Sequence, residues 1–331
     1  MNSNSRAAGR YSIILYLLLV LACATPGTPP IATRTYDDFV VVTAKADDTF
    51  SSLAARYLHD PAKGWIIADF NGRDALTAGA TVIIPLRSFN RGGLKADGYQ
   101  TVPVLCYHNF STNQPDKLTV SEAAFEEQMK FLHDNGYSVI TMDQLLDFLD
   151  FKIPLPDKSV VISIDDGWIT GFTIAYPVLK KYNFPATYFI YTDFIGAKKA
   201  LSWTNIKELV DNGFAVQAQS KSHRNLSLAK ENESFKDYVE AIKTELTEPQ
   251  RAIKEHTNKE CTYLAYPYGA TNKLVIALLK KHGYRGAFTV QQGPNPFFVD
   301  NYLINRTLIY GTHTLEEFEK ALAVFHAARL Q

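Results

Sequence analysis

The stretch SVVISIDDGW, from Ser159 to Trp168, contains the pattern that decides the fold. Its first half is a continuous apolar run, typical of a β-strand that is buried on both faces of a parallel sheet. The run ends in two adjacent carboxylates, Asp165 and Asp166, followed by a glycine. Two like charges at the end of a buried strand repel each other and lose hydration, so something nearby must compensate them.

Working outward, strand-like and helix-like runs alternate along residues 101–331. Such alternation predicts an α/β fold with a parallel sheet, and this many units favours a (β/α) barrel. The predicted strands are Val102–Tyr107, Val160–Ile164, Ala186–Tyr191, Phe214–Ala218, Thr262–Tyr266 and Gly286–Val290. The predicted helices are Glu122–His133, Tyr176–Tyr182, Asn205–Asn212, Phe235–Glu255 and Lys273–His282.

Polar residues follow several of these predicted strands. His108 follows the first strand, Gln219 and His223 follow a later one, and the turn Tyr266-Pro267-Tyr268 follows another. The carboxyl ends of barrel strands meet on one rim, so we expect these side chains to lie near the two aspartates. A divalent metal ion there would bind one aspartate and keep its neighbour ionised as a base.

Composition limits the other possibilities. The chain has 331 residues, enough for about two domains, and its 34 basic residues balance 34 acidic ones. Bulk charge therefore gives no sign of a nucleic-acid partner, and we expect none.

The N-terminus has the pattern of an export signal. Arg6 and Arg10 precede an apolar run that is short for a membrane span and ends at Cys23. Val20–Cys23 resembles a bacterial lipobox, which predicts a signal over residues 1–23 and lipidation of Cys23. Ordinary secretion and an uncleaved anchor are the alternatives. A lipoprotein would hold the chain on a membrane of the bacterial cell envelope, facing the periplasm or the exterior, through a tether over residues 24–38.

A small unit follows at residues 39–86, and residues 87–100 read as a linker with paired glycines. The unit has a strand, two helices and a closing strand. It resembles a LysM module, through Val41, Asp48-Thr49-Phe50, Leu53-Ala54, Tyr57, Ile66-Ile67, Asn71, Gly79 and Val82–Pro85. The resemblance implies binding of N-acetylglucosamine-containing glycans; the alternative is a spacer that does not bind them.

The second domain, residues 101–331, resembles the polysaccharide deacetylases, also called the NodB-homology family or carbohydrate esterase family four. ISIDDGW is similar to the family's T-F-D-D-G motif. Four further blocks follow in the family's order: Phe184–Ile190, Leu201–Phe214, Ser220–Ser227 and Tyr266–Gly269. The resemblance implies hydrolytic N-deacetylation of an N-acetylglucosamine-containing polysaccharide, either peptidoglycan or an exopolysaccharide, with release of acetate.

Carried over to this chain, the resemblance implies a role for each matching residue. Asp165 would be the general base, and Asp166 and His223 would bind a divalent metal. The metal would be zinc, with nickel, cobalt and manganese as the other ions considered. His108 matches the general acid of the branch that acts on poly-β-1,6-N-acetylglucosamine, and Tyr268 matches the residue whose backbone N–H faces the oxyanion.

Two departures from the family pattern leave a second function open. Gln219 stands where the family has a metal-binding histidine, so we expect its amide oxygen to be a weak third ligand. The arginine that orients the base is absent from its usual motif, and Arg306 is the candidate substitute. The alternative to an active enzyme is therefore a glycan-binding pseudoenzyme.

Overall fold

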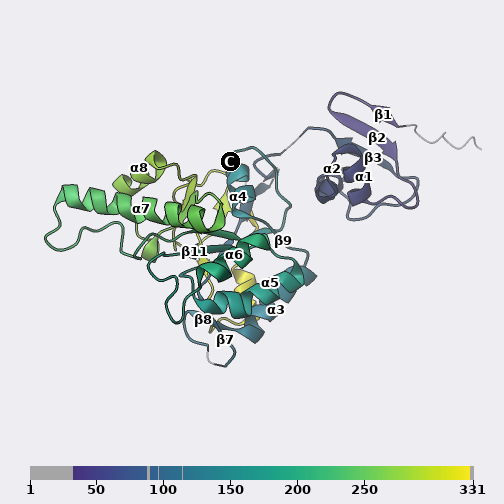
Figure 1. The fold of residues 1–331 in the computed structure, drawn as a ribbon. Coiled ribbons are helices and arrows are strands. Elements are labelled where there is room, and N and C mark those ends of the chain that lie inside the picture. Colours follow the sequence, from purple (N-terminus) through teal and green to yellow (C-terminus); the bar gives the residue numbers. More distant parts are fainter. Residues whose placement is uncertain (1–32, 88–89, 96, 114, 329–331) are drawn as a thin grey trace, which may run out of the picture. The chain divides into compact units, whose positions relative to one another are not determined.

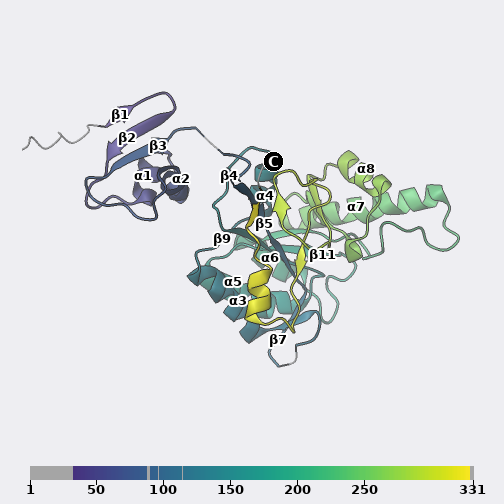
Figure 2. The ribbon, with the colours of Figure 1, turned by 180° about the vertical axis from the view of Figure 1, so that it is seen from behind.

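The computed structural model describes residues 33–87, 90–95, 97–113 and 115–328. The chain divides into two compact units, residues 1–86 and 87–331. Each unit has its own hydrophobic core, and Figures 1 and 2 show the small one in purple and the large one in blue to yellow. The predicted signal and Cys23 lie outside the described residues.

Unit 1 is a three-stranded antiparallel sheet packed against two short helices. Its elements are β1 (Arg34–Thr35), β2 (Phe39–Thr43), α1 (Phe50–Tyr57), the 3₁₀ turn Pro61–Lys63, α2 (Gly64–Asn71) and β3 (Thr81–Pro85), with strand order β1-β2-β3. Helix α1 begins after Thr49, whose hydroxyl accepts from the Ser52 amide in a capping box. Leu53 and Ile67 are buried against Val82 and Ile84. The strand–helix–helix–strand pattern predicted from the sequence is present.

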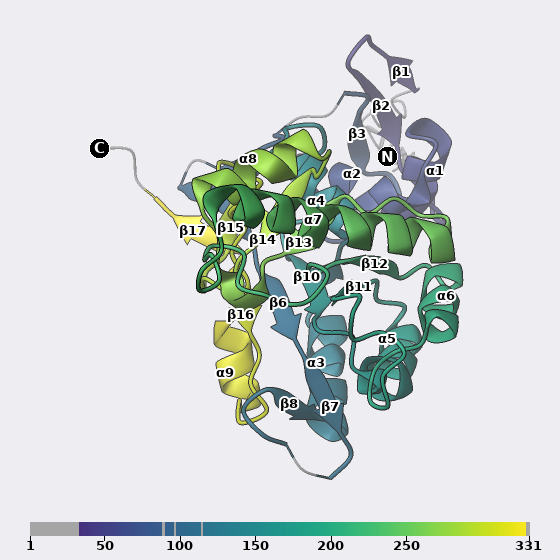
Figure 3. The same ribbon diagram turned by 60° about the vertical axis from the view of Figure 1, so that its left-hand side comes forward.

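The centre of unit 2 is a parallel sheet with strand order β14-β13-β12-β11-β10-β6-β16. Figure 3 shows the central strands β6, β10, β11 and β12 with helices on either side. The strands are β6 (Val104–Tyr107), β10 (Ser159–Ile164), β11 (Thr187–Ile190), β12 (Ala215–Ala218), β13 (Tyr263–Ala265), β14 (Gly286–Phe288) and β16 (Thr307–Leu308); the short β9 (Ser138–Val139) also pairs with β10. All six predicted strands lie within two residues of the bounds of β6, β10, β11, β12, β13 and β14.

The segment before β16 closes this sheet into a distorted barrel. Ile304 forms a parallel bridge with Phe288 of β14, and the amide of Thr289 donates to the Ile304 carbonyl at 2.8 Å. Three residues later, Thr307 pairs with Leu105 of β6. The residues between these two contacts therefore join the two edges of the sheet. The predicted α/β barrel class is confirmed.

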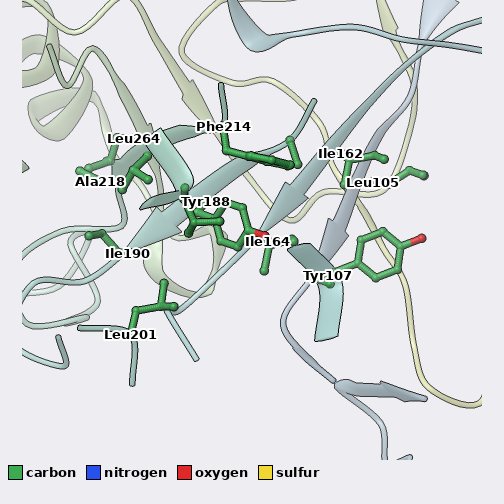
Figure 4. Packing of buried hydrophobic residues seen from close by; sticks show 14 of the residues in the cluster. Leu105, Tyr107, Ile162, Ile164, Tyr188, Ile190, Leu201, Phe214, Ala218 and Leu264 are labelled. Carbon is green, nitrogen blue, oxygen red and sulfur yellow. The ribbon is translucent and has the colours of Figure 1, made fainter. Parts of the chain in front are cut away.

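Helices surround the barrel and bury its outer face. They are α3 (Glu122–Asp134), α5 (Tyr176–Tyr182), α6 (Trp203–Asp211), α7 (Phe235–Thr257), α8 (Lys273–Lys281) and α9 (Leu315–Lys320). Ile162 and Ile164 of β10 pack with Leu105, Tyr107, Tyr188 and Ile190 in the core beneath them (Figure 4). Helix α4 (Met142–Leu149) packs instead in the core cluster that contains Val161. Among the described residues, no helix is long and apolar enough to cross a membrane.

Alternate residues of β10 point the other way, into the barrel. Val161 belongs to a second core cluster, together with Phe189, Phe288 and Ile304. Successive strand residues face opposite sides of a sheet, so Ser163 and Asp165 continue the inward face of Val161. This alternation places the first aspartate of the pair inside the carboxyl end of the barrel.

The remaining elements lie outside the barrel pattern. A sheet beside the barrel contains β4 (Leu94–Lys95), β5 (Gly98–Val102), β15 (Asn295–Pro296) and β17 (Phe325–Ala327), and a second pair is β7 (Asn109–Ser111) with β8 (Thr119–Ser121). The predicted first strand, Val102–Tyr107, is in fact the end of β5 followed by β6, because Pro103 separates them. A π-helical turn, Gly171–Ala175, precedes α5.

Candidate active site

The carboxyl ends of the barrel strands bring the predicted site residues together. Asp165 and Asp166 directly follow β10, and His108 directly follows β6. Gln219 follows β12 and is hydrogen-bonded to both aspartates. Arg306, which immediately precedes β16, reaches Asp165 across the barrel.

Asp165 and Arg306 form a buried, two-pronged ion pair. The Arg306 Nη1–Asp165 Oδ1 distance is 2.7 Å, and the Nη2–Oδ2 distance is 2.8 Å. The side chains are 0% and 1% exposed. Arg306 also donates through Nε to the Thr289 carbonyl. Burial would lower the pKa of Arg306, but the adjacent Asp165 carboxylate raises it above its ordinary value. Arg306 is therefore charged and compensates the charge of Asp165.

Gln219 uses both ends of its amide on the aspartate pair. Its Oε1 accepts the backbone N–H of Asp166 at 2.8 Å, and its Nε2 donates to Asp165 Oδ2 at 3.3 Å. The side chain is 3% exposed. A backbone N–H can only donate and a carboxylate can only accept, so this network fixes which end of the amide is the oxygen. Gln219 thus bridges the two aspartates, and its predicted role as a metal ligand stays a prediction.

Asp166 faces His223. The His223 Nε2 atom lies 3.6 Å from Asp166 Oδ1, and the indole N–H of Trp168 donates to Oδ2 at 3.2 Å. Burial would raise the pKa of Asp166, but His223, His108 and Trp168 together hold that pKa below its ordinary value. Asp166 is therefore a carboxylate at neutral pH, which is the form that binds a cation.

The backbone is strained at the same place. Asp166 has φ = 73°, Ser220 68°, His223 60° and Tyr268 59°. Such left-handed conformations cost free energy for residues other than glycine, and they gather at functional sites where the surroundings enforce them. The strain lies in the two loops that present Asp166 and His223 and in the turn that presents Tyr268.

A cavity of about 500 Å³ opens beside Asp166. His108, Asp166 and Trp168 line it, together with Asn109, Asp116, Lys117, Leu118 and Thr119. Within the described residues, Nδ1 of His108 is buried and has no hydrogen-bond partner. A ring nitrogen without a partner is available to a group that the structure does not contain.

Aromatic rings continue along the rim from this cavity. The Trp168 ring packs edge-to-face on Phe194, which stacks on Tyr191 at 5.1 Å. Tyr191 packs on His223, and His223 on Tyr268, each with ring centroids 4.9 Å apart. Tyr268 is 67% exposed. Amphipathic rings at a polar site suit contact with the apolar faces of sugar rings.

The turn Tyr266-Pro267-Tyr268 lies at the end of β13. Tyr266 is buried, and its hydroxyl donates to the Tyr302 carbonyl at 3.0 Å. Pro267 is buried and begins a 3₁₀ turn, Pro267–Gly269. Tyr266 and Pro267 thus anchor the turn, while Tyr268 is the exposed residue that reaches the imidazole of His223.

A second group of possible ligands lies deeper. Cys106, His108 and Asp165 have donor atoms within 4.8 Å of one another. However, burial raises the pKa of the Cys106 thiol well above its ordinary value, and both Asp165 oxygens contact Arg306. A protonated thiol is a poor ligand. Asp166 and His223 are therefore the better pair for a cation.

The geometry of Asp166 and His223 fits a bound metal ion. Two ligands with bonds of about 2.1 Å in tetrahedral geometry lie about 3.4 Å apart, close to the 3.6 Å between Nε2 and Oδ1. That separation is long for a direct hydrogen bond. Carboxylate and imidazole are both common ligands of divalent transition metals.

Comparison with known proteins finds a matching family for the central part of unit 2. Residues 152–287 match the sequence profile of the polysaccharide deacetylase family. This part of unit 2 is similar to the polysaccharide deacetylases. The matched residues include the aspartate pair, Gln219, His223 and the Tyr268 turn.

Relatives match more than half of this chain. A poly-β-1,6-N-acetyl-D-glucosamine N-deacetylase of Staphylococcus aureus (strain MRSA252) is 29% identical over 210 residues, 61% of this chain and 72% of that protein. A Bacillus cereus polysaccharide deacetylase structure is 27% identical, with a TM-score of 0.57, and the match covers 77% of this chain and 80% of that one. IcaB from Ammonifex degensii is 26% identical, with a TM-score of 0.59, over 69% of this chain and 96% of that one.

Sequence reasoning missed several residues of the site. The sequence pattern predicts no role for Trp168, but its indole contacts Asp166 and Trp168 lines the cavity. Its position two residues after the aspartate pair was the available signal. Glu245, which contacts the loop before His223, lies 22 residues from that histidine in a helix rich in charged residues. The residues around Glu245 in the sequence do not indicate that it contacts the site.

Proposed function

We propose that this protein is a metal-dependent hydrolase that removes N-acetyl groups from an N-acetylglucosamine-containing polysaccharide of the bacterial cell surface or cell wall. The observation that carries the proposal is the pairing at the barrel rim: a buried aspartate held by Arg306 beside a second aspartate that faces His223. The similarity to the Staphylococcus aureus enzyme supports a poly-β-1,6-linked exopolysaccharide as the first substrate to test. Peptidoglycan is the second.

Asp166 and His223 would hold the divalent cation. When bound, it would lower the pKa of a water molecule and polarise the acetyl carbonyl. Zinc is the ion that a carboxylate and an imidazole favour, with nickel, cobalt and manganese as the others to test. Gln219 would contribute mainly by orienting the two aspartates, because its amide is hydrogen-bonded to both.

Asp165 would act as the general base. A carboxylate offers about four lone-pair positions, of which Arg306 and Gln219 occupy three. The remaining position can accept a proton from the water that attacks the acetyl carbon. Arg306 keeps the carboxylate oriented for this proton transfer.

The other two residues would complete the hydrolysis. The backbone N–H of Tyr268 would donate to the oxyanion as the carbonyl becomes tetrahedral. His108, protonated, would deliver a proton to the amine nitrogen as its bond to the acetyl carbon breaks. Acetate and a free glucosamine unit are the products.

Acetate release tests this function directly. Purified protein, stripped of metal by a chelator and then given zinc, is expected to release acetate from poly-β-1,6-N-acetylglucosamine oligomers. Release should fall to the uncatalysed level in the chelator and recover on adding the ion. No release with any of the four ions, from either the oligomers or peptidoglycan, would contradict the proposal.

A second candidate is a glycan-binding protein without catalysis. The observation that favours it is Gln219, whose amide is hydrogen-bonded to the two aspartates where the family has a metal-binding histidine. Loss of one strong ligand weakens the cation site. Saturable binding of the same oligomers without acetate release, at any metal concentration, would establish this candidate.

Unit 1 and the N-terminus would bring the enzyme to its substrate. Unit 1 would act as a LysM-like module that binds N-acetylglucosamine oligomers, and lipidation of Cys23 would anchor the chain to a membrane of the cell envelope. Cys23→Ser is expected to move the protein from the membrane fraction to the soluble fraction. An unchanged distribution would contradict the anchor.

A further inference from the structure

A carboxylate on helix α7 is buried beneath the loop that carries His223. Glu245 lies near the middle of α7 and is only 7% exposed. Its neighbours on the outer face of the helix, such as Glu240, Lys243 and Arg251, form exposed ion pairs with one another or with nearby residues. An ionised carboxylate is costly to bury unless hydrogen bonds replace its water.

The loop supplies those hydrogen bonds. Glu245 Oε2 accepts the backbone N–H of Lys221 at 2.9 Å and that of Ser222 at 2.8 Å. Glu245 Oε1 accepts the Ser222 hydroxyl at 2.5 Å. Two successive amides that point into one concavity form an anion-binding site, and here a carboxylate of the same chain fills it.

The same loop is strained at both ends. Ser220 and His223 have left-handed backbones, with φ of 68° and 60°. Within the loop, the His223 N–H donates to the Ser220 hydroxyl at 3.0 Å. Left-handed conformations at residues other than glycine persist only where the surroundings enforce them. Lys221 and Ser222, whose amides donate to Glu245, lie between these two residues. Their hydrogen bonds are therefore placed to enforce both left-handed conformations.

We propose that Glu245 is a positioning residue for His223. By holding the Lys221 and Ser222 amides, it keeps the loop in the strained form in which the imidazole Nε2 lies 3.6 Å from Asp166 Oδ1. This inference rests on the proposed function in one respect, because it takes His223 and Asp166 as the ligands of the cation. Glu245 touches neither the cation position nor the substrate cavity; it acts through the loop.

Three substitutions of Glu245 in the full-length protein separate the effect of its side-chain length from the effect of its charge. Glu245→Leu removes every acceptor at similar volume. Glu245→Gln loses the charge but keeps a carbonyl oxygen that can accept both amides. Glu245→Asp keeps the charge but is shorter by one C–C bond, about 1.5 Å. The control is Glu255→Leu, on the same helix, because Glu255 pairs only with the exposed Arg251 among the described residues.

Zinc affinity is measured by calorimetry on metal-free protein, and hydrogen exchange reports protection of the Lys221 and Ser222 amides. Glu245→Leu is expected to weaken zinc binding about 10- to 100-fold, the usual effect of removing a group that supports a ligand. Protection of the Lys221 and Ser222 amides from hydrogen exchange should fall in the same variant. Glu245→Gln should retain most of the zinc affinity and most of the amide protection, whereas Glu245→Asp should retain little of either property. Glu255→Leu should match the wild type in both measurements.

The outcomes distinguish this inference from the proposed function. Wild-type zinc affinity in Glu245→Leu, with the two amides exposed to exchange, would overturn the positioning role alone. If Glu245→Leu does not fold, wild-type affinity in Glu245→Asp would overturn it in the same way. A wild type that binds zinc but releases no acetate overturns the proposed catalysis and leaves the role of Glu245 standing. A wild type that binds none of the four ions (zinc, nickel, cobalt or manganese) overturns both.

Discussion

The charge of Asp165 serves both stability and the proposed chemistry. Arg306 is completely buried, and the Asp165 carboxylate is the group that neutralises it. Removing one partner of a buried pair leaves an uncompensated charge and costs about 3–5 kcal/mol. The residue proposed as the general base therefore also holds the barrel together where Arg306 crosses it.

Asp165→Asn is expected to abolish acetate release and to lower the free energy of unfolding by about 3–5 kcal/mol. The amide cannot accept a proton from water, and it leaves Arg306 charged and unpaired. The double variant Asp165→Asn/Arg306→Met should regain much of the stability, because no unpaired charge remains, yet stay inactive. Urea denaturation and acetate release measure the two effects separately. Activity in Asp165→Asn would remove Asp165 from the mechanism.

Gln219 shows how a residue in a recognised motif can take a different role. Its position was evident from the sequence, four residues before His223. Its hydrogen bonds were not, because they depend on Asp165 and Asp166, more than fifty residues earlier in the chain. The same applies to Arg306, which the sequence offered only as a substitute for a missing arginine and which lies 141 residues from its partner.

Gln219→Leu is expected to lower kcat about tenfold or more with little change in KM, because misplacing a reacting group by a small distance costs up to about 100-fold. Gln219→His restores the family's residue and is expected to tighten zinc binding, since imidazole is a better zinc ligand than an amide. Calorimetry with zinc and steady-state acetate release provide the measurements. If the histidine variant binds zinc no more tightly, residue 219 does not face the cation.

At the scale of elements, the sequence predicted the helices and strands whose apolar residues repeat with a clear period. Helix α7 and strands β10 and β12 lie close to their predicted bounds because their apolar residues repeat over several turns or pleats. Strand β16, only two residues long, and the bridge at Ile304 were not predicted. Segments this short contain no full period, and only the tertiary pairing defines them. The unpredicted elements include the closing segment that carries Arg306.

The turn after β13 offers a test of an element that positions one backbone group. Gly269 has φ = 68°, and a Cβ there would lie 2.5 Å from Val290 Cγ2 and 2.7 Å from its backbone nitrogen. Gly269→Ala is therefore expected to displace the Tyr268 turn and lower kcat about tenfold or more, while zinc affinity stays near the wild-type value. Steady-state kinetics and calorimetry check this.

Gly283 provides the matched control. Its φ is 77°, but a Cβ there would meet nothing within 4 Å. Gly283→Ala carries the same left-handed strain, about 1–3 kcal/mol, without touching the site. It should lower stability and leave kcat unchanged. Equal kcat values in the Gly269→Ala and Gly283→Ala variants would show that the turn does not position the oxyanion donor.

At the scale of the whole molecule, the chain combines two folded units with separate cores. The sequence indicated both, because the alternating pattern of unit 2 differs in period and length from the short pattern of unit 1. The family match at residues 152–287 lies within unit 2, and the glycan-binding role of unit 1 rests on its residue pattern. If unit 1 does bind the same polymer, linking it to the enzyme raises the effective concentration of substrate at the active site.

This coupling predicts a difference between short and long substrates. A chain that begins at Arg87 and lacks unit 1 is expected to release acetate from short soluble oligomers at the full-length rate, because such oligomers occupy only the barrel cavity. On an insoluble polymer or on peptidoglycan, the shortened chain should need about 100-fold or more enzyme for the same rate, since two linked binding sites commonly gain that much avidity. Sedimentation of unit 1 alone with each polymer is the companion measurement. Equal activity of the two proteins on both substrates, with no sedimentation of unit 1, would make unit 1 a spacer.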